Sequence, residues 1–275
     1  NTPPAISTQP AAIAVNAGTS ATFKVVASGT APLSYQWRLN GTPIAGATAA
    51  TYTVVSAKQT DVGLYDVTVD NIAGSVTSST ALLTLNTPVS ILAAPTPVTV
   101  NPGASFALSV SASGTAPMTF QWRKNGVAIA GGTYASYSSA SASATSAGSY
   151  DVVISNAAGS VTSPAAKVSV NAALTILTQP AGGAINPGAS KTLTVSASGT
   201  SPVSYQWRKG GVPLQGGTAS SFTIASADAS SVGSYHVVLT NVVGSVTSAP
   251  ATITLNLPVS FTVQPVGAAL NPGTS

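Results

Sequence analysis

The chain has 275 residues, of which 44% are apolar and only 5% are charged, and it carries nine Lys and Arg, five Asp, one His and no Cys. The length allows one to three domains, and the absence of Cys excludes disulfides, thiolate metal ligands and a cysteine nucleophile. Nine cations spread over this length argue against a nucleic-acid partner, and no apolar run is long enough to span a membrane.

The chain repeats itself with a period of 85 residues and no insertion. Trp, Tyr and Asn residues recur in register at Trp37, Trp122 and Trp207, at Tyr65, Tyr150 and Tyr235, and at Asn1, Asn86, Asn171 and Asn256. Self-similarity at a fixed period indicates tandem structural units. The register predicts domains at residues 1–85, 86–170 and 171–255. Residues 256–275 are interpreted as the opening strands of a fourth domain, with strand donation to a neighbouring molecule as the alternative.

Along the first repeat, apolar and polar residues alternate over residues 21–28, 35–40 and 65–70. A period of two predicts strands with one buried face, and no apolar stripe with the helical period accompanies it. Turn-forming residues separate these runs. At Asn40-Gly41 both residues tolerate positive φ, which predicts a tight hairpin. We therefore expect about seven or eight strands in each repeat and an all-β chain.

Three landmarks recur in order in each repeat. In the first, Tyr-Gln-Trp-Arg at residues 35–38 resembles strand C of an immunoglobulin domain, residues 61–67 resemble the tyrosine corner leading into strand F, and residues 71–74 resemble the F–G turn. On these residues the chain resembles the cysteine-free, I-set-like immunoglobulin domains found in tandem in large bacterial secreted and surface proteins. The resemblance covers the whole chain. It implies tandem Greek-key β-sandwiches outside the cell or at its surface.

The resemblance also implies which residues fill each core. Val residues stand where the family has its two disulfide cysteines, so we expect apolar burial to hold each sandwich together. The predicted core positions are Trp37, Trp122, Trp207, Tyr65, Tyr150, Tyr235, Val25, Val67, Val110, Val152, Val195 and Val237. On strand E, the second repeat has Ser139 where the others have Val54 and Ile224, which predicts that the second domain has the least stable core.

Side chains that could carry catalysis are scarce. The acids are Asp61, Asp66, Asp70, Asp151 and Asp228, and His236 is the single imidazole. Catalysis requires titratable groups placed together, and here they are scattered, with Asp66 and His236 at the same repeat position on an outward strand face. Asp66 and Asp70 share an outward face and could hold a cation loosely, but the pair occurs in the first repeat only. We therefore expect Asp66, Asp70 and His236 to be exposed surface residues. We predict no catalytic, cofactor-binding or metal site and no enzymatic activity.

One basic residue recurs on strand C, at Arg38, Arg123 and Arg208. One interpretation is a ladder of basic contacts for an acidic glycan. The other is a cross-strand ion pair with the opposing acid of strand F, Asp66 in the first repeat and Asp151 in the second, which contributes less than about 1 kcal/mol when exposed. The ion pair is favoured, although His236 breaks the pairing in the third repeat.

The few charges leave an exterior of Ser, Thr, Asn, Gln, Ala and Gly. Charge ordinarily keeps proteins apart, so we expect copies to associate, end to end and side by side. Short linkers containing Pro88 or Pro258 predict a stiff rod. The features together predict a non-enzymatic extracellular structural protein that forms a surface stalk or fibre. The alternatives are an adhesin or carbohydrate-binding array, with a polysaccharide or a host or cell-surface ligand as partner, and a spacer region of a larger secreted enzyme.

Overall fold

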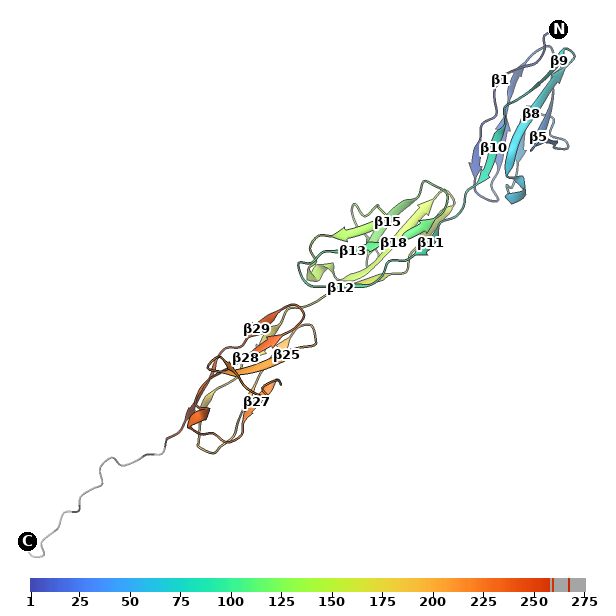
Figure 1. Ribbon diagram of the computed structural model, residues 1–275. Helices are drawn as coiled ribbons and strands as arrows, with labels where there is room; N and C mark the ends of the chain where they lie inside the picture. Colours follow the sequence, from blue (N-terminus) through green and yellow to red (C-terminus); the bar gives the residue numbers. More distant parts are fainter. Residues whose placement is uncertain (258, 260–266, 268–275) are drawn as a thin grey trace, which may run out of the picture. The chain divides into compact units, whose positions relative to one another are not determined.

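The computed structural model describes residues 1–257, 259 and 267. Within these residues the chain forms β-strands and three single-turn 3₁₀ helices and has no α-helix. The strands build three immunoglobulin-like β-sandwiches that follow one another along the sequence, as predicted (Figure 1). We expected strands in residues 256–275. Of these residues the structure describes 256, 257, 259 and 267, so that prediction falls on residues outside the described part of the chain.

Each sandwich contains ten strands and one 3₁₀ helix. The first consists of β1 (Ala5–Thr8), β2 (Ile13–Val15), β3 (Ala21–Lys24), β4 (Val26–Ser28), β5 (Ser34–Leu39), β6 (Thr42–Pro43), β7 (Thr51–Val54), η1 (Gln59–Asp61), β8 (Gly63–Asn71), β9 (Gly74–Thr77) and β10 (Ala81–Leu85). The second consists of β11 (Ser90–Ala93), β12 (Val98–Val100), β13 (Phe106–Ser109), β14 (Ser111–Ser113), β15 (Thr119–Lys124), β16 (Val127–Ala128), β17 (Ser136–Ser139), η2 (Ala144–Ser146), β18 (Gly148–Asn156), β19 (Gly159–Thr162) and β20 (Ala166–Val170). The third consists of β21 (Thr175–Thr178), β22 (Gly183–Ile185), β23 (Lys191–Thr194), β24 (Ser196–Ser198), β25 (Ser204–Lys209), β26 (Val212–Pro213), β27 (Ser221–Ile224), η3 (Ala229–Ser231), β28 (Gly233–Thr240), β29 (Ser245–Thr247) and β30 (Ala251–Leu255).

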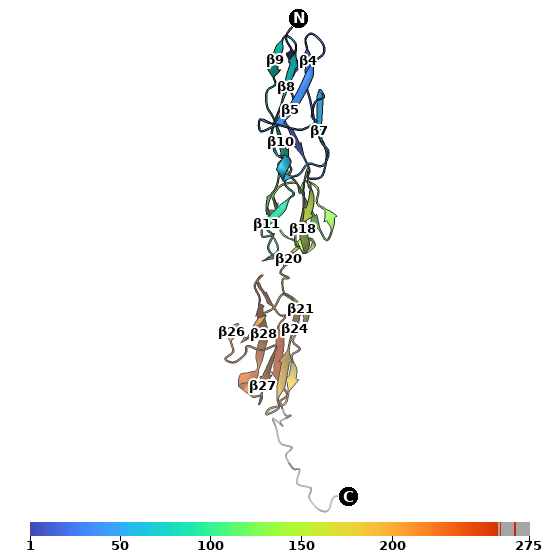
Figure 2. The same ribbon diagram turned by 90° about the vertical axis from the view of Figure 1, so that its right-hand side faces the viewer.

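Each sandwich has two layers. In the first sandwich, one sheet has the strand order β2-β10-β8-β5-β6, with β9 also paired to β8, and β2 runs parallel to β10. The other layer contains the antiparallel pairs β1–β4 and β3–β7, and only Val25 separates β3 from β4. Figure 2 shows the first sandwich from the side, with β7 lying apart from β8. The second and third sandwiches repeat this arrangement, with β15 and β18, or β25 and β28, in place of β5 and β8.

The alternation in the sequence becomes an alternation in burial. Along β8, Tyr65, Val67 and Val69 are at most 1% exposed. In β3, Ala21 and Phe23 are buried, and the residue that follows each of them is exposed. Successive side chains of a strand point to opposite faces, so the inward set of each layer meets in the middle of the sandwich.

A Trp with no exposed surface lies in each core, at Trp37, Trp122 and Trp207. Trp37 Nε1 donates a hydrogen bond to the backbone oxygen of Ala49 at 2.9 Å, and the equivalent bonds of the other two Trp have the same length. Phe23 stacks on Tyr65 with ring centroids 4.5 Å apart. The Val residues at the family's cysteine positions are at most 6% exposed, at Val25, Val67, Val110, Val152, Val195 and Val237. Packed apolar side chains therefore occupy the place of the disulfide.

A buried Tyr is the third residue of β8, β18 and β28, the longest strand of each large sheet. Tyr65, Tyr150 and Tyr235 are at most 3% exposed. Tyr65 Oη donates to the backbone oxygen of Asp61 at 2.8 Å, and Tyr235 Oη donates to that of Ser231 at 2.9 Å. Burial raises the pKa of Tyr65 to about 12 and also raises the pKa of Tyr150 and of Tyr235. The geometry is that of a tyrosine corner.

Different residues cap the 3₁₀ helix that precedes this strand. In η1, Asp61 Oδ2 accepts a hydrogen bond from the Lys58 backbone N–H at 3.0 Å. In η3, Ser231 Oγ accepts from the Asp228 backbone N–H at 3.1 Å, and Asp228 Oδ1 accepts from the Ser231 backbone N–H at 3.0 Å. In η2, Ser146 takes the place of the acid as the acceptor. Ser can replace Asp here because the free N–H of a helix end needs only an oxygen.

The predicted hairpin at Asn40-Gly41 is present. Both residues have positive φ, 49° and 79°, as a two-residue type I′ turn requires, and both turn positions have positive φ in the other two sandwiches as well. Asn40 Oδ1 accepts a hydrogen bond from the Leu64 backbone N–H at 2.9 Å and so joins the turn to β8. A Cβ on Gly63 would lie 2.7 Å from the Asn40 side chain, so this close approach favours glycine.

The leading Asn of the second and third repeats, and Asn256 after the third, bonds back to the sandwich that precedes it. The Asn86 backbone N–H donates to the Val15 oxygen at 2.8 Å, and Asn86 Nδ2 donates to Asn16 Oδ1 at 2.8 Å. The equivalent side-chain bonds, Asn171 to Asn101 and Asn256 to Asn186, are both 2.7 Å long. The end of each final strand is thereby tied to the turn that follows β2, β12 or β22.

Candidate interaction surface

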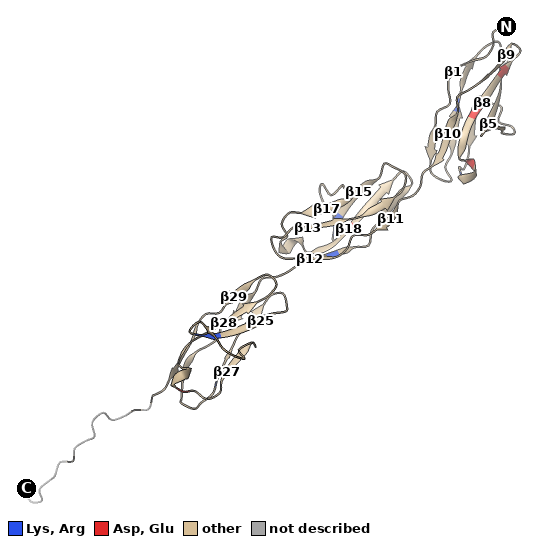
Figure 3. Ribbon diagram, in the orientation of Figure 1, with Lys and Arg blue, Asp and Glu red and all other residues tan. Residues whose placement is uncertain are grey.

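The predicted Arg positions lie on one sheet face of each sandwich. We call the outward surface of the pairs β5–β8, β15–β18 and β25–β28 the arginine face. On it the register places Arg38 opposite Asp66, Arg123 opposite Asp151, and Arg208 opposite His236. Figure 3 shows how few other charged residues the three sandwiches carry.

In the first sandwich the opposed residues form an ion pair. Arg38 Nε donates to Asp66 Oδ1 at 2.6 Å, and the two side chains are 29% and 10% exposed. The hydrogen bond to Asp66 raises the pKa of Arg38. The second sandwich has the same pair with two bonds, from Arg123 Nε to Asp151 Oδ1 at 2.7 Å and from Arg123 Nη2 to Asp151 Oδ2 at 2.9 Å. Such two-pronged contacts are the strong form of an Arg–carboxylate interaction.

The expectation that Asp66, Asp70 and His236 are exposed is wrong for Asp66, which is buried. Asp70 and His236 are half-buried, as are Asp61 and Asp151. Only Asp228 is exposed. The physical reason at Asp66 is that the Arg38 side chain reaches across the strand pair and lies against the carboxylate, which the alternation within one strand does not reveal.

In the third sandwich the Arg has no acid opposite it. Arg208 Nη1 donates to the Gly211 oxygen at 3.1 Å. Arg208 Nε is buried and donates to no group among the described residues. The single acid of this sandwich, Asp228, accepts hydrogen bonds from Ser230 and Ser231, chiefly from the Ser230 hydroxyl, and these lower its pKa. The cross-strand pairing interpretation therefore fits two of the three Arg positions.

The opposite surface of each sandwich carries hydroxyl groups. We call the outward surface of β3, β4 and β7, and of their equivalents in the other sandwiches, the hydroxyl face. Thr22 Oγ1 and Thr53 Oγ1 are hydrogen-bonded at 2.9 Å, and Thr192 and Thr223 form the same pair at the same distance. The sequence predicted the composition of this surface but not the pairing across strands, because pairing depends on register.

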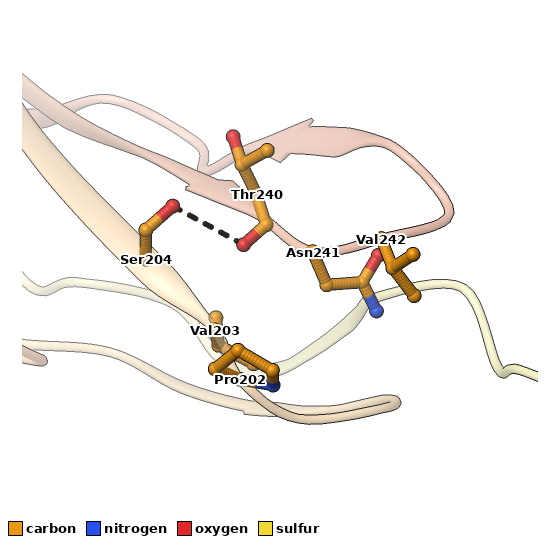
Figure 4. A pocket seen from close by; sticks show the side chains of 6 residues that line it. All are labelled: Pro202, Val203, Ser204, Thr240, Asn241 and Val242. Atoms are coloured by element: carbon orange, nitrogen blue, oxygen red, sulfur yellow. Dashed lines mark hydrogen bonds between the residues drawn. The ribbon is translucent and has the colours of Figure 1, made fainter.

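A pocket of about 440 Å³ lies at one end of the third sandwich (Figure 4). It is lined by Pro202, Val203, Ser204, Thr240, Asn241 and Val242. Ser204 Oγ donates to the Thr240 oxygen at 3.3 Å across it. The lining has no titratable side chain. The sequence did not predict this pocket, because it forms where two loops distant in sequence meet.

The described part of the chain contains no group of three His, Cys, Asp or Glu residues placed to hold a metal ion. In that part, no helix has the length and apolarity needed to cross a membrane. Tyr134 is 73% exposed, so its ring stands well into solvent in the second sandwich, unlike the core aromatics.

Comparison with known proteins places these features in a family. The family model described as "Immunoglobulin I-set domain" matches residues 4–84, 89–170 and 174–256. The Decoration protein of Escherichia phage T5 is 41% identical over 78 residues, which is 28% of this chain and 48% of that protein, so the match spans about half of the relative's length.

Solved structures with the same fold include tandem immunoglobulin fragments. The I-band fragment I67–I69 of titin has a TM-score of 0.68 at 24% identity and covers 94% of this chain and 100% of the fragment. Domains 1–5 of Sidekick-1 have a TM-score of 0.52 at 19% identity and cover 92% of this chain and 59% of that one. These likenesses concern the fold. With three matched segments that together cover most of its length, the chain belongs to the immunoglobulin I-set family.

Proposed function

We propose that this protein is a non-enzymatic structural module of an outer surface, in which tandem I-set sandwiches form a stalk or fibre. The observation that carries the proposal is the contrast between interior and exterior. Each sandwich holds an aromatic core around Trp37, Trp122 or Trp207, and the exterior presents hydroxyls, amides and few charges. Such a surface suits a permanent material better than a freely diffusing protein, because little of it titrates or repels a neighbour.

Side-by-side packing uses the hydroxyl face in this proposal. Within the described residues its β7-type strands lie at the edge of their layer and pair on one side only, to β3, β13 or β23. An edge strand leaves backbone hydrogen-bonding groups available to another chain. The exposed side chains of the edge strands themselves are Thr and Ser rather than the Lys that ordinarily discourages association, for example Thr53, Ser138 and Thr223. In the first sandwich the neighbouring strand β3 adds the exposed Lys24 to the hydroxyl face.

Sedimentation of the full chain tests this proposal. We expect assembly to grow with protein concentration and to change little between low and high salt, because hydroxyl contacts are not screened. Thr53→Lys with Thr223→Lys should abolish assembly. The matched control is Leu82→Lys with Thr252→Lys, which adds the same charge to the other sheet. Both positions are equivalent to Lys167 of the second repeat, so the fold accepts Lys there, and assembly should stay intact. A chain that stays monomeric at high concentration, or equal behaviour of the two variants, would count against packing through this face.

The phage relative favours a second candidate location for the same structural role. The Decoration protein of Escherichia phage T5 shares 41% identity over 78 residues with this chain. The name calls that protein a decoration protein of a phage, which makes the exterior of a phage particle an alternative to a cell surface for this chain. Antibody labelling of intact cells and of purified particles from the source would distinguish the two, and labelling of neither would contradict both.

A further inference from the structure

We propose that the third sandwich carries a binding site for the carboxylate of an acidic saccharide, centred on Arg208 and His236. The site lies on the arginine face of β25 and β28. This inference goes beyond the structural role proposed above and does not depend on it, because it concerns a ligand of one sandwich rather than contacts between copies.

The first two sandwiches show what the Arg position accepts. Arg38 Nε lies 2.6 Å from a carboxylate oxygen of Asp66. Arg123 makes a two-pronged contact with Asp151 through Nε and Nη2. In both cases the carboxylate comes from the residue directly opposite on the neighbouring strand. The fold thus presents an Arg fork to a planar carboxylate at this site.

The third sandwich has the Arg, at Arg208, but no carboxylate at the opposite position. His236 occupies the opposite position. Asp228 is held by Ser230 and Ser231 in η3, and Lys209 Nζ donates to the Ser230 oxygen, so neither is available to the arginine face. Arg208 Nε consequently has no acceptor among the described residues.

A covered N–H without an acceptor is unfavourable, and the strongest acceptor for a guanidinium is a carboxylate or phosphate held by two parallel bonds. Turning the guanidinium away from the Gly211 oxygen would give up one bond at 3.1 Å. In the orientation that Arg123 adopts, Nε and Nη2 would then face the place of the missing Asp. A carboxylate from outside the chain can fill that place beside the His236 ring.

The surroundings favour a saccharide as the bearer of the carboxylate. Gln206 and Ser234 flank the site along β25 and β28, and Val238 is the half-buried apolar neighbour opposite Gln206. Gln206 Nε2 donates to the Trp207 and Leu214 oxygens, so its Oε1 can accept a hydrogen bond from a sugar hydroxyl. Protein partners rely on large apolar or aromatic anchors at the centre of a contact, and the flanking groups here offer hydrogen bonds instead.

Nuclear magnetic resonance of the full chain tests the site directly. The sequence contains three Arg, so their Nε–H groups give three cross-peaks, and Arg38 and Arg123 act as internal controls. Titration with trigalacturonate should shift the Arg208 peak alone. The methyl ester of the same trisaccharide, which keeps the sugar and removes the charge, should not shift it. No shift at Arg208, or equal shifts at all three Arg, would overturn the proposal.

Two variants test whether the missing acid creates the site, and two further probes test which class of anion it binds. His236→Asp rebuilds the internal ion pair and should weaken trigalacturonate binding by about tenfold or more, with the other resonances unchanged as evidence of folding. Asp151→His should create a second responding peak at Arg123. If sodium sulfate or a tetraglutamate peptide shifts Arg208 at the same concentrations as trigalacturonate, the assignment to an acidic saccharide is wrong.

Discussion

At the level of single residues, the largest buried side chain of each core is a Trp. Trp37 has no exposed surface, contacts the aromatic cluster of the first sandwich, and bonds through Nε1 to the Ala49 oxygen. No disulfide supplements this packing, since the chain has no Cys. The loss of a single core ring therefore has no covalent compensation.

Trp37→Ala should lower the free energy of unfolding of the first sandwich by about 3–5 kcal/mol, since it removes a buried ring and leaves a cavity. Urea denaturation of the full chain, followed by circular dichroism, measures the effect as a shift of the transition that belongs to the first sandwich. Val55→Ala is the control, because Val55 is 78% exposed. A change in unfolding free energy as small as that of the control would contradict the role assigned to Trp37.

Tyr65 makes the first sandwich sensitive to alkali. Burial raises its pKa to about 12 in the folded chain, whereas an unfolded chain has a Tyr pKa of about 10. The stabilisation is therefore complete below about pH 10 and is lost as the pH rises toward 12. Tyr65→Phe should flatten this alkaline loss while weakening the fold at neutral pH through the lost bond to the Asp61 oxygen. Unfolding midpoints measured across this range check the prediction, and equal alkaline slopes would contradict it.

At the level of elements, equivalent segments reach the same geometry by different chemistry. The 3₁₀ helices η1 and η3 are capped by acids at different positions, Asp61 at the last residue of η1 and Asp228 just before the first residue of η3. The strands β7, β17 and β27 also differ, because Val54 and Ile224 are buried while Ser139 is half-buried. Each difference predicts a different stability for its sandwich.

Asp228 should make the third sandwich sensitive to acid. Hydrogen bonds from Ser230 and Ser231 lower its pKa below the ordinary value. The stabilisation is thus present above the unfolded pKa of about 3.9 and is lost as the pH falls through the lower folded pKa. Asp228→Asn should remove this part of the acid dependence. Thermal unfolding from mildly to strongly acidic pH tests it, and an unchanged acid profile in the variant would refute the assignment.

Ser139 should make the second sandwich the least stable. A buried aliphatic side chain at this strand position contributes about 1–2 kcal/mol, and the second sandwich lacks it. Calorimetry of the full chain should show the second sandwich melting first, and Ser139→Val should raise that transition. The control is Ser138→Val, which places the same side chain on the exposed face of β17. If Ser139→Val lowers the transition, packing at this strand is not the cause.

At the level of the whole molecule, stability should depend little on salt. The described residues contain two Arg–Asp ion pairs, in which the Arg side chains are 29% and 31% exposed, and ion pairs open to solvent contribute about 1 kcal/mol or less each. The packing of the apolar cores involves no charges, so salt does not screen its contribution to stability. Raising sodium chloride from low to high concentration should shift the unfolding free energy by less than about 1 kcal/mol, as measured by urea titration. A larger loss would reveal an electrostatic contribution that the ion pairs do not account for.

The fold was largely predictable because its signals are local. Alternation over residues 21–28 and 65–70 indicated the strands, the Asn40-Gly41 pair indicated the hairpin, and the recurring Trp and Tyr indicated the sandwich. The interaction surface was less predictable. The pairing of Arg38 with Asp66 could be proposed from strand order, but the burial of Asp66 required the observed path of the Arg38 side chain.

Sequence alone therefore determined the period, the all-β class and the identity of the core residues, since burial on one face of a strand follows from spacing along the chain. Tertiary structure decided which charges meet. It placed carboxylates 28 positions away against Arg38 and Arg123 and left Arg208 Nε buried without an acceptor among the described residues. Ion pairs form only between charged side chains that lie within a few ångströms of each other. Here those side chains belong to different strands, so their distances are set only when the sheets assemble.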